Sequence, residues 1–268
     1  MENLLKNPGF EDPLTDKEGK VILSTTVKGF RTVGPSSAAN WLVWNNLQTQ
    51  PNESFEPTTT TELVDSDSTL AGGDKKMIHV NTDGERCGIE QVFLPLNTGP
   101  ALTFSSALVY VKSGKVGLGT GNGGNTGLDT FSTKTNAWEL LQFPNRNAHS
   151  NAIIVFSASK GAEFYVDNAT VKVLDLTGKW QCNDGGTYYL RQLDNQLWWY
   201  GEKSATNPNW SNVLKGTIEG YNISGQWADV PKGTVQQNGD MVIQVVDANH
   251  FKAVKKTGGF AGSEWTRL

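Results

Sequence analysis

Hydrophobic and polar positions alternate along most of the chain, or apolar residues run together for short stretches. Examples are LTFSSALVYVKSG (102–114), AIIVFSAS (152–159) and AEFYVDNATVKVLD (162–175), which Gly, Asn, Asp and Pro residues separate. A period of two is typical of β-strands, and no window keeps the i, i+3, i+4, i+7 spacing of an amphipathic helix. The pattern predicts an all-β protein in which helix is limited to single turns.

The glycine-rich stretch GLGTGNGGNTG (117–127) contains the spacing G-x-G-x-x-G from Gly119 to Gly124. In a dinucleotide site such glycines join a strand to a helix, whose N-terminal amides hold the phosphate. Here KVGLGTG continues a strand and NGGNTGLDT leads into a turn, so we expect no phosphate site. Gly117, Gly119 and Gly121 share one strand face, which predicts either a bulge or bend, or a shallow polar groove that a ligand approaches.

A change in composition near Leu174 divides the chain into residues 1–174 and 175–268. The second part holds six of the nine Trp residues and twelve Trp, Tyr or Phe residues in 94 positions. It also splits into eight short strand candidates: GKWQC, TYYLRQL, QLWWYGE, VLKGTIE, ISGQWAD, DMVIQVV, HFKAVKK and SEWTRL. We expect tight turns at Asp194-Asn195, Tyr221-Asn222 and Ala248-Asn249. Eight antiparallel strands with tight joints predict a small up-and-down β-barrel.

Charge and apolar content exclude several classes of protein. The 268 residues carry 23 Lys and Arg against 27 Asp and Glu, and neither part of the chain has an excess of basic residues. We therefore expect no nucleic-acid partner. The longest apolar run, 152–156, is far too short to span a bilayer, and MENLLKN lacks the apolar core of a secretory signal. An extracellular or surface-acting protein would then be a mature form, or would leave the cell by another route. Cys87 and Cys182 fall in different parts, so we expect two thiols.

The two ends of the first part resemble a known family. The opening NLLKNPGFED (3–12) and the closing FYVDNATVKV (164–173) resemble the first and last strands of CenC-type carbohydrate-binding modules. That resemblance implies a jelly-roll β-sandwich with a galactose-binding-like fold over residues 1–174. It also implies a structural Ca²⁺ ion held by Glu11, Asp167 and the Gly9 carbonyl, because a hard cation needs several oxygen ligands. The alternative is that both carboxylates are ordinary surface groups.

The second part begins LTGKW, and Gly178-Lys179-Trp180 resembles the G-x-W signature of calycin barrels, the lipocalin and avidin superfamily. The resemblance implies that Trp180 packs across one end of the barrel and that a basic residue near the C-terminus, Arg267, lies over it. The alternative is an unrelated small barrel with an aromatic core. The chain shows no match to the biotin-contacting residues of avidin, so the resemblance implies no ligand.

Aromatic residues beside polar ones are candidates for ligand binding in the first part. Trp41 and Trp44 in NWLVWNN lie on opposite faces of an extended strand, so we expect one in the core and the other at a groove. The predicted sugar platform combines the tryptophan at the groove with amides and a carboxylate that would take sugar hydroxyls. Its candidate members are either Trp41 or Trp44, together with Asn45, Asn46, Asn122, Asn125 and Asp129. A purely structural pair of tryptophans is the alternative.

The barrel has candidates of the same kind. Trp198 and Tyr200 share one strand face while Trp199 takes the other, so aromatic side chains point both inward and outward. Trp210 lies in the polar loop NPNWSN, where it either marks an interaction site or packs over a barrel mouth.

Nothing in the sequence assembles a catalytic constellation. The three His residues lie in unrelated segments without metal-ligand spacing, and no nucleophile elbow or Cys/His pairing is present. We predict a non-catalytic, lectin-like carbohydrate-binding protein. The second hypothesis is a bacterial toxin component or assembly subunit, in which the sandwich recognises a receptor and the barrel contacts a partner chain or mediates oligomerisation.

Overall fold

The computed structural model describes residues 3–29, 32–45, 55–66, 75–93, 103–121, 130–144 and 152–268. These residues form strands, turns and irregular segments, and none of them is helical, which confirms the all-β prediction. Accordingly, the described residues include no helix of the length and apolarity that crossing a membrane requires.

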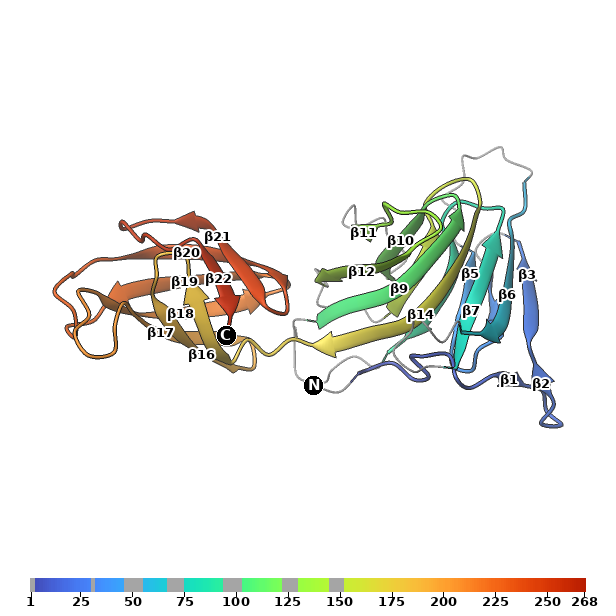
Figure 1. Cartoon of the computed structure of the whole chain (residues 1–268), viewed down its shortest axis with the longest axis horizontal. Coiled ribbons are helices and arrows are strands. Elements are labelled where there is room, and N and C mark those ends of the chain that lie inside the picture. The colour runs from blue at the N-terminus through green and yellow to red at the C-terminus, as the bar shows by residue number, and fades with distance from the viewer. Residues whose placement is uncertain are drawn as a thin grey trace.

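Two six-stranded antiparallel sheets make up the first part of the chain (Figure 1). The first sheet has the order β12-β9-β14-β7-β6-β3 and the second has the order β11-β10-β13-β8-β5-β4. The first sheet consists of β3 (Ser24–Lys28), β6 (Thr58–Asp65), β7 (Lys76–Thr82), β9 (Thr103–Ser113), β12 (Trp138–Pro144) and β14 (Ala162–Val173). The second sheet consists of β4 (Thr32–Pro35), β5 (Leu42–Asn45), β8 (Cys87–Val92), β10 (Val116–Gly121), β11 (Thr130–Phe131) and β13 (Ala152–Ser157). A separate hairpin pairs β1 (Leu14–Thr15) with β2 (Val21–Ile22).

Alternation along the strands explains how the two sheets pack. In β9, Val109 and Val111 point into one buried cluster, and they meet Ile153 and Val155 of the second sheet there. The residues between them, such as Tyr110, therefore point away from the core, because successive side chains alternate across a strand. The first part is thus a β-sandwich whose outer faces are built from the polar and aromatic positions of the same strands.

The glycine-bearing face of β10 has a structural explanation. Gly117 pairs with Phe156 of β13, and a Cβ atom at position 117 would lie 2.6 Å from the Phe156 ring. The missing side chain therefore makes room for that ring, as a close approach in a strand requires. The prediction that KVGLGTG continues a strand is confirmed, because β10 runs to Gly121. The turn predicted after Gly121 lies outside the described residues.

Eight strands in sequential order close the second part into a barrel, which confirms the up-and-down prediction. They are β15 (Gly178–Cys182), β16 (Thr187–Leu193), β17 (Gln196–Glu202), β18 (Ser211–Glu219), β19 (Asn222–Asp229), β20 (Asn238–Asp247), β21 (His250–Lys256) and β22 (Glu264–Arg267). The predicted turns at Asp194-Asn195 and Ala248-Asn249 connect the expected strands. The turn predicted at Tyr221-Asn222 is wrong by one residue, because Gly220 supplies the positive φ of 59° and Asn222 already pairs with Glu219.

Aromatic side chains fill the barrel interior. Trp199 and Trp265 lie 5.4 Å apart between ring centroids, and Phe251 stacks on Trp265 at 5.0 Å. The buried aromatic residues that the second part contributes to this cluster are Trp180, Tyr188, Trp199, Trp227, Phe251, Phe260 and Trp265. An eight-stranded barrel is just wide enough for its own side chains to fill, so the interior here is a core.

A four-residue segment joins the two parts, since β14 ends at Val173 and β15 begins at Gly178. The predicted boundary after Leu174 falls within it. Leu174 and Leu176 are buried with the barrel cluster, and Phe104 at the start of β9 joins the same cluster. The two Cys residues, one in each part, are both free thiols, as expected.

Candidate functional site

A row of aromatic side chains crosses the outer face of the first sheet. Trp138 of β12 pairs with Tyr110 of β9, Tyr110 pairs with Tyr165 of β14, and Tyr165 pairs with His79 of β7. The row continues to Glu62 of β6. Residues paired directly across strands share one face, so these five side chains lie beside one another on the surface away from the core.

The rings of this row contact one another along its length. The Tyr110 centroid lies 5.6 Å from that of Trp138 and 6.1 Å from that of Tyr165, both in edge-on geometry. His79 stacks on Tyr165 with centroids 4.6 Å apart. Edge-on and offset contacts of this kind fix ring orientation, so the aromatic row is a preformed surface.

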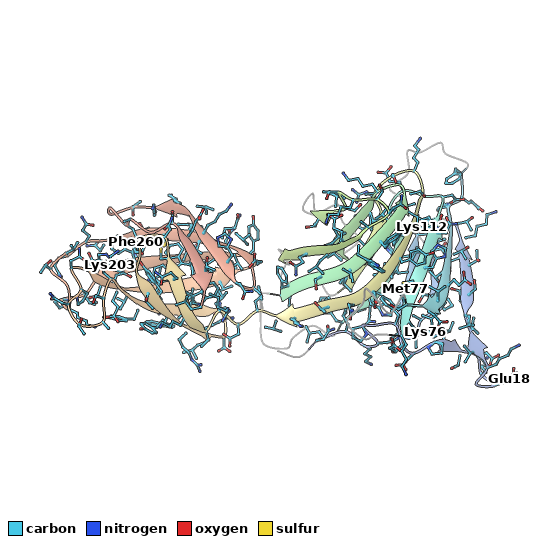
Figure 2. The ribbon with its side chains drawn as sticks, in the orientation of Figure 1. Glu18, Lys76, Met77, Lys112, Lys203 and Phe260 are labelled. Carbon is cyan, nitrogen blue, oxygen red and sulfur yellow. The ribbon has the colours of Figure 1, made fainter. Side chains whose placement is uncertain are left out.

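Charged groups lie along one side of the aromatic row and at its β6 end. Glu163 Oε1 lies 2.8 Å from Lys112 Nζ and 3.1 Å from His79 Nε2, and Glu62 Oε2 lies 3.9 Å from His79 Nδ1. The hydrogen bond from Lys112 lowers the pKa of the Glu163 carboxyl below its ordinary value, and the same bond raises the pKa of Lys112. Figure 2 shows Lys112 and Met77 on this sheet. Met77 lies two residues before His79 on the same face of β7. The site therefore offers fixed donors and acceptors beside the rings.

The dimensions of the row suit an elongated ligand. Trp138 and His79 stand on strands three spacings apart, which corresponds to about 14 Å at about 4.8 Å per spacing. All four ring-bearing side chains are half-buried, so each presents part of its surface to solvent. The surface can therefore contact several rings of an extended molecule at once.

Two of the residues predicted to bind a ligand in the sandwich lie in the interior. Trp41 is buried against Phe10 at 4.8 Å, and its Nε1 donates to the Asn7 carbonyl at 3.0 Å. Asn45 is fully buried, where its Nδ2 donates to the Val27 carbonyl and its Oδ1 accepts from Thr59. Neither presents a surface to a ligand, so both have a structural role.

Trp44 lies on the opposite strand face from Trp41, as its odd spacing predicts. It is half-buried on the outer face of the second sheet, paired with Val33 and Gly88. The aromatic row is on the first sheet, so Trp44 is not part of it. Asn46, Asn122, Asn125 and Asp129 lie outside the described residues.

The barrel residues predicted to bind a ligand fall into two groups. Trp198 and Tyr200 point outward from β17 while Trp199 is buried, as the alternation predicts. Trp210 packs at one end of the barrel, with its ring 6.0 Å from that of Tyr188 and against Gly186. The ring packing agrees with the alternative in which Trp210 covers a barrel mouth.

The residues predicted to hold Ca²⁺ come from segments that the fold brings side by side. The Ala169 amide donates to the Pro8 carbonyl at 3.0 Å, which places the opening segment against β14 near Asp167. Asp167 is buried and accepts a hydrogen bond from the Asn168 amide at 2.7 Å, while the exposed Glu11 accepts the amides of Lys75 and Lys76. Within the described ranges, no group of three or more His, Cys, Asp or Glu residues is arranged to hold a metal ion.

The aromatic row was not predicted from the sequence. The alternation of Leu108, Tyr110 and Lys112 indicates that Tyr110 shares a strand face with them. Which strands lie beside β9 depends on pairings with β12 and β14, and local patterns do not encode these.

No protein-family model and no curated protein matches the sequence. Among solved structures, the chain is similar to the CBM22-1 and GH10 modules of endo-1,4-β-D-xylanase 10B from Clostridium thermocellum, complexed with xylohexaose. The identity is 12% and the TM-score 0.30, over 42% of this chain and only 24% of that one. The chain is also similar to the CBM22-1–CBM22-2 tandem domain of Xyn10C from Paenibacillus barcinonensis, with 11% identity and a TM-score of 0.36, over 78% and 83% of the two chains. Similarity at this level does not bear on the ligand of this chain.

Proposed function

We propose that this chain is a non-catalytic, lectin-like carbohydrate-binding protein, and that the aromatic row of the first sheet binds an extended saccharide. The observation that carries the proposal is the continuous register of Trp138, Tyr110, Tyr165 and His79 across four neighbouring strands.

The chemistry of this surface matches that of a sugar chain. A sugar ring presents apolar C–H faces that pack on aromatic rings, and its hydroxyls need donors and acceptors at the ring edge. Lys112 and Glu163 supply a donor and an acceptor whose positions are fixed by their mutual ion pair. A row about 14 Å long, measured in strand spacings, favours an oligosaccharide over a single sugar ring.

The test is a glycan array probed with the 268-residue chain and with its Trp138→Ala and Tyr165→Ala variants. We expect each variant to bind the recognised glycans at least about tenfold more weakly, which corresponds to about 1.4 kcal/mol. Phe131→Ala is the matched control, because Phe131 is an exposed aromatic residue on the second sheet. Its binding should equal that of the parent.

The alternative hypothesis has a distinct outcome in the same experiment. Absence of any glycan signal, together with oligomers that form with increasing protein concentration, would favour a toxin component or an assembly subunit. Glycan binding that neither aromatic substitution weakens would place the site elsewhere on the chain and contradict the proposal.

A further inference from the structure

The outer surface of the barrel carries a groove that the aromatic row of the sandwich does not explain. We propose that this groove, across β17, β18, β19 and β20, is a second saccharide-binding site that makes the chain bivalent. The inference rests on the proposed function, because it assigns the same class of ligand to a separate surface.

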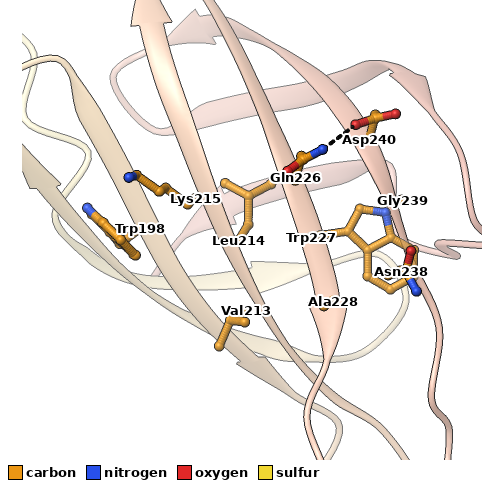
Figure 3. Close-up of a pocket in the computed structure, with 10 residues that line it drawn as sticks. All are labelled: Trp198, Val213, Leu214, Lys215, Gln226, Trp227, Ala228, Asn238, Gly239 and Asp240. Atoms are coloured by element: carbon orange, nitrogen blue, oxygen red, sulfur yellow. Dashed lines mark hydrogen bonds between the residues drawn. The ribbon is translucent and has the colours of Figure 1, made fainter.

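Four outward-facing residues form one line across these strands. Trp198 pairs with Lys215, Lys215 with Gln226, and Gln226 with Asp240. Figure 3 shows them beside the groove, with Trp198 on one side and Asp240 on the other. The groove has a volume of about 400 Å³. Small-molecule sites typically have volumes of about 300–1,000 Å³.

Exposed apolar side chains are concentrated on the Trp198 side of the groove. Trp198 is 44% exposed, Tyr189 43% and Val213 39%. Tyr200 stacks on Tyr189 with ring centroids 6.4 Å apart, and it follows Trp198 by two residues on the same strand face. The barrel interior is already filled by other aromatic residues, so these outward rings add nothing to the core. Clustered exposed aromatic residues of this kind mark an interaction site.

The polar groups of the groove favour a neutral, hydroxyl-rich ligand. Lys215 Nζ lies 4.9 Å from the Trp198 ring centroid and forms no ion pair with a described residue. Opposite it, Gln226 Nε2 donates to Asp240 Oδ1 at 3.3 Å (Figure 3). One cation and one anion balance in charge, while ammonium, amide and carboxylate groups together provide both donors and acceptors. A saccharide ring stacked near Trp198 would meet both kinds of partner.

Two sites on one chain change how the protein holds a polymer. Once one surface is bound to a polysaccharide, the second encounters other segments of the same polymer at high effective concentration. Avidity can then exceed either single affinity by a factor of about 10²–10⁴ if the geometry permits both contacts. A soluble hexasaccharide that reaches only one site at a time should show no such gain.

The experiment uses the 268-residue chain and two single variants, Tyr165→Ala in the sandwich and Trp198→Ala in the barrel, together with the double variant. Each is tested on an array of neutral oligosaccharides that includes xylohexaose and cellohexaose. Trp198→Phe keeps an aromatic ring and should retain part of the binding that Trp198→Ala loses. Leu193→Ala, which truncates another exposed side chain of the barrel, controls for effects on folding.

The expected result is that Tyr165→Ala weakens the glycan signals without abolishing them, and that adding Trp198→Ala lowers these remaining signals by at least about tenfold more. The inference is overturned if Trp198→Ala changes no signal in either background. If Trp198→Ala weakens binding and Tyr165→Ala does not, the barrel site stands and the proposed role of the aromatic row fails. If the parent binds no saccharide, both proposals fail.

Discussion

The guanidinium carbon of Arg267 lies 4.5 Å from the centroid of the Trp180 ring, on the strand that pairs with β15. Its Nη1 donates to the Thr177 carbonyl at 2.9 Å, its Nη2 to the Asp175 carbonyl at 2.7 Å, and its Nε to the Ala248 carbonyl at 3.2 Å. The contact between Arg267 and Trp180 that the G-x-W resemblance implies is therefore confirmed. The Arg267 side chain therefore covers the indole. Its hydrogen bonds also link β22 to the turn between β20 and β21 and to the segment that joins the two parts of the chain.

Substitutions at this contact should destabilise the barrel to different extents. Trp180→Ala removes a fully buried indole, so we expect a loss of about 3–5 kcal/mol in the free energy of unfolding. Arg267→Ala loses the cation–π contact and three hydrogen bonds, for a smaller loss of about 1–3 kcal/mol. Urea unfolding measures both losses. Arg267→Lys should fall between Arg267→Ala and the parent, because lysine keeps the charge without the planar fork of donors. An Arg267→Ala loss no larger than that of the exposed Arg191→Ala would contradict this role.

The ion pair between Glu163 and Lys112 predicts a pH dependence of stability. Lys112 lowers the pKa of Glu163 in the folded state, so the stabilisation is complete above the ordinary glutamate pKa and disappears as pH falls through the lowered value. The raised pKa of Lys112 gives the opposite dependence of stability on pH, because its stabilisation is lost as pH rises through that raised value. We expect Glu163→Gln to lower the Tm at pH 7, and the difference from the parent to shrink as the pH falls below the ordinary glutamate range. Glu18→Gln, at an exposed turn, should show no such trend. A Tm difference for Glu163→Gln that is independent of pH would show that charge is not the cause.

The two thiols should resist alkylation while the protein is folded. Burial raises the pKa of both Cys87 and Cys182 to about 12. Only the thiolate reacts, and at pH 8 about one thiol in ten thousand is ionised at such a pKa. Mass spectrometry after iodoacetamide treatment at pH 8 should find neither residue modified in the native protein and both modified in urea. Rapid labelling of either residue without denaturant would contradict the buried placement.

The calcium ion implied by the CenC-type resemblance stays a prediction with a direct test. An ion held between the opening segment and β14 would stabilise the sandwich, because a ligand that binds only the folded state shifts unfolding to higher temperature. A chelator should then lower the Tm of the parent, and Ca²⁺ should restore it. Asp167→Asn should abolish the response to chelator, whereas Asp16→Asn should preserve it. If the chelator leaves the Tm of the parent unchanged, no such ion contributes.

The barrel was more predictable from sequence than the sandwich surface, for a reason that lies in the topology. GKWQC, TYYLRQL, QLWWYGE and HFKAVKK match β15, β16, β17 and β21 residue for residue. Each barrel strand pairs with its neighbours in sequence apart from the closing pair, so local alternation and turn residues suffice. In the sandwich, Trp138 and Tyr165 both flank Tyr110, although 27 residues separate them in the chain.

The sandwich residues Trp41 and Asn45 show a second limit of sequence patterns. Alternation correctly places Trp41 and Trp44 on opposite faces, but it does not say which face meets the core. Asn45 shares the inward face, where Thr59 and the Val27 carbonyl satisfy its amide. A polar side chain with such partners is stable inside, so its polarity alone was a poor guide to exposure.

The sequential strand order of the barrel also bears on the rate at which each part of the chain folds. Seven of the eight strand pairings are hairpins between consecutive strands, and only β15 with β22 joins distant residues. Contacts that are close in sequence form quickly, because little loop-closure entropy opposes them. The sandwich instead pairs β5 with β8, β9 with β14 and β8 with β13, each across intervening strands. In refolding from denaturant the barrel hairpins should therefore form ahead of the sandwich sheets, and the β15–β22 pairing that positions Arg267 should complete the barrel last.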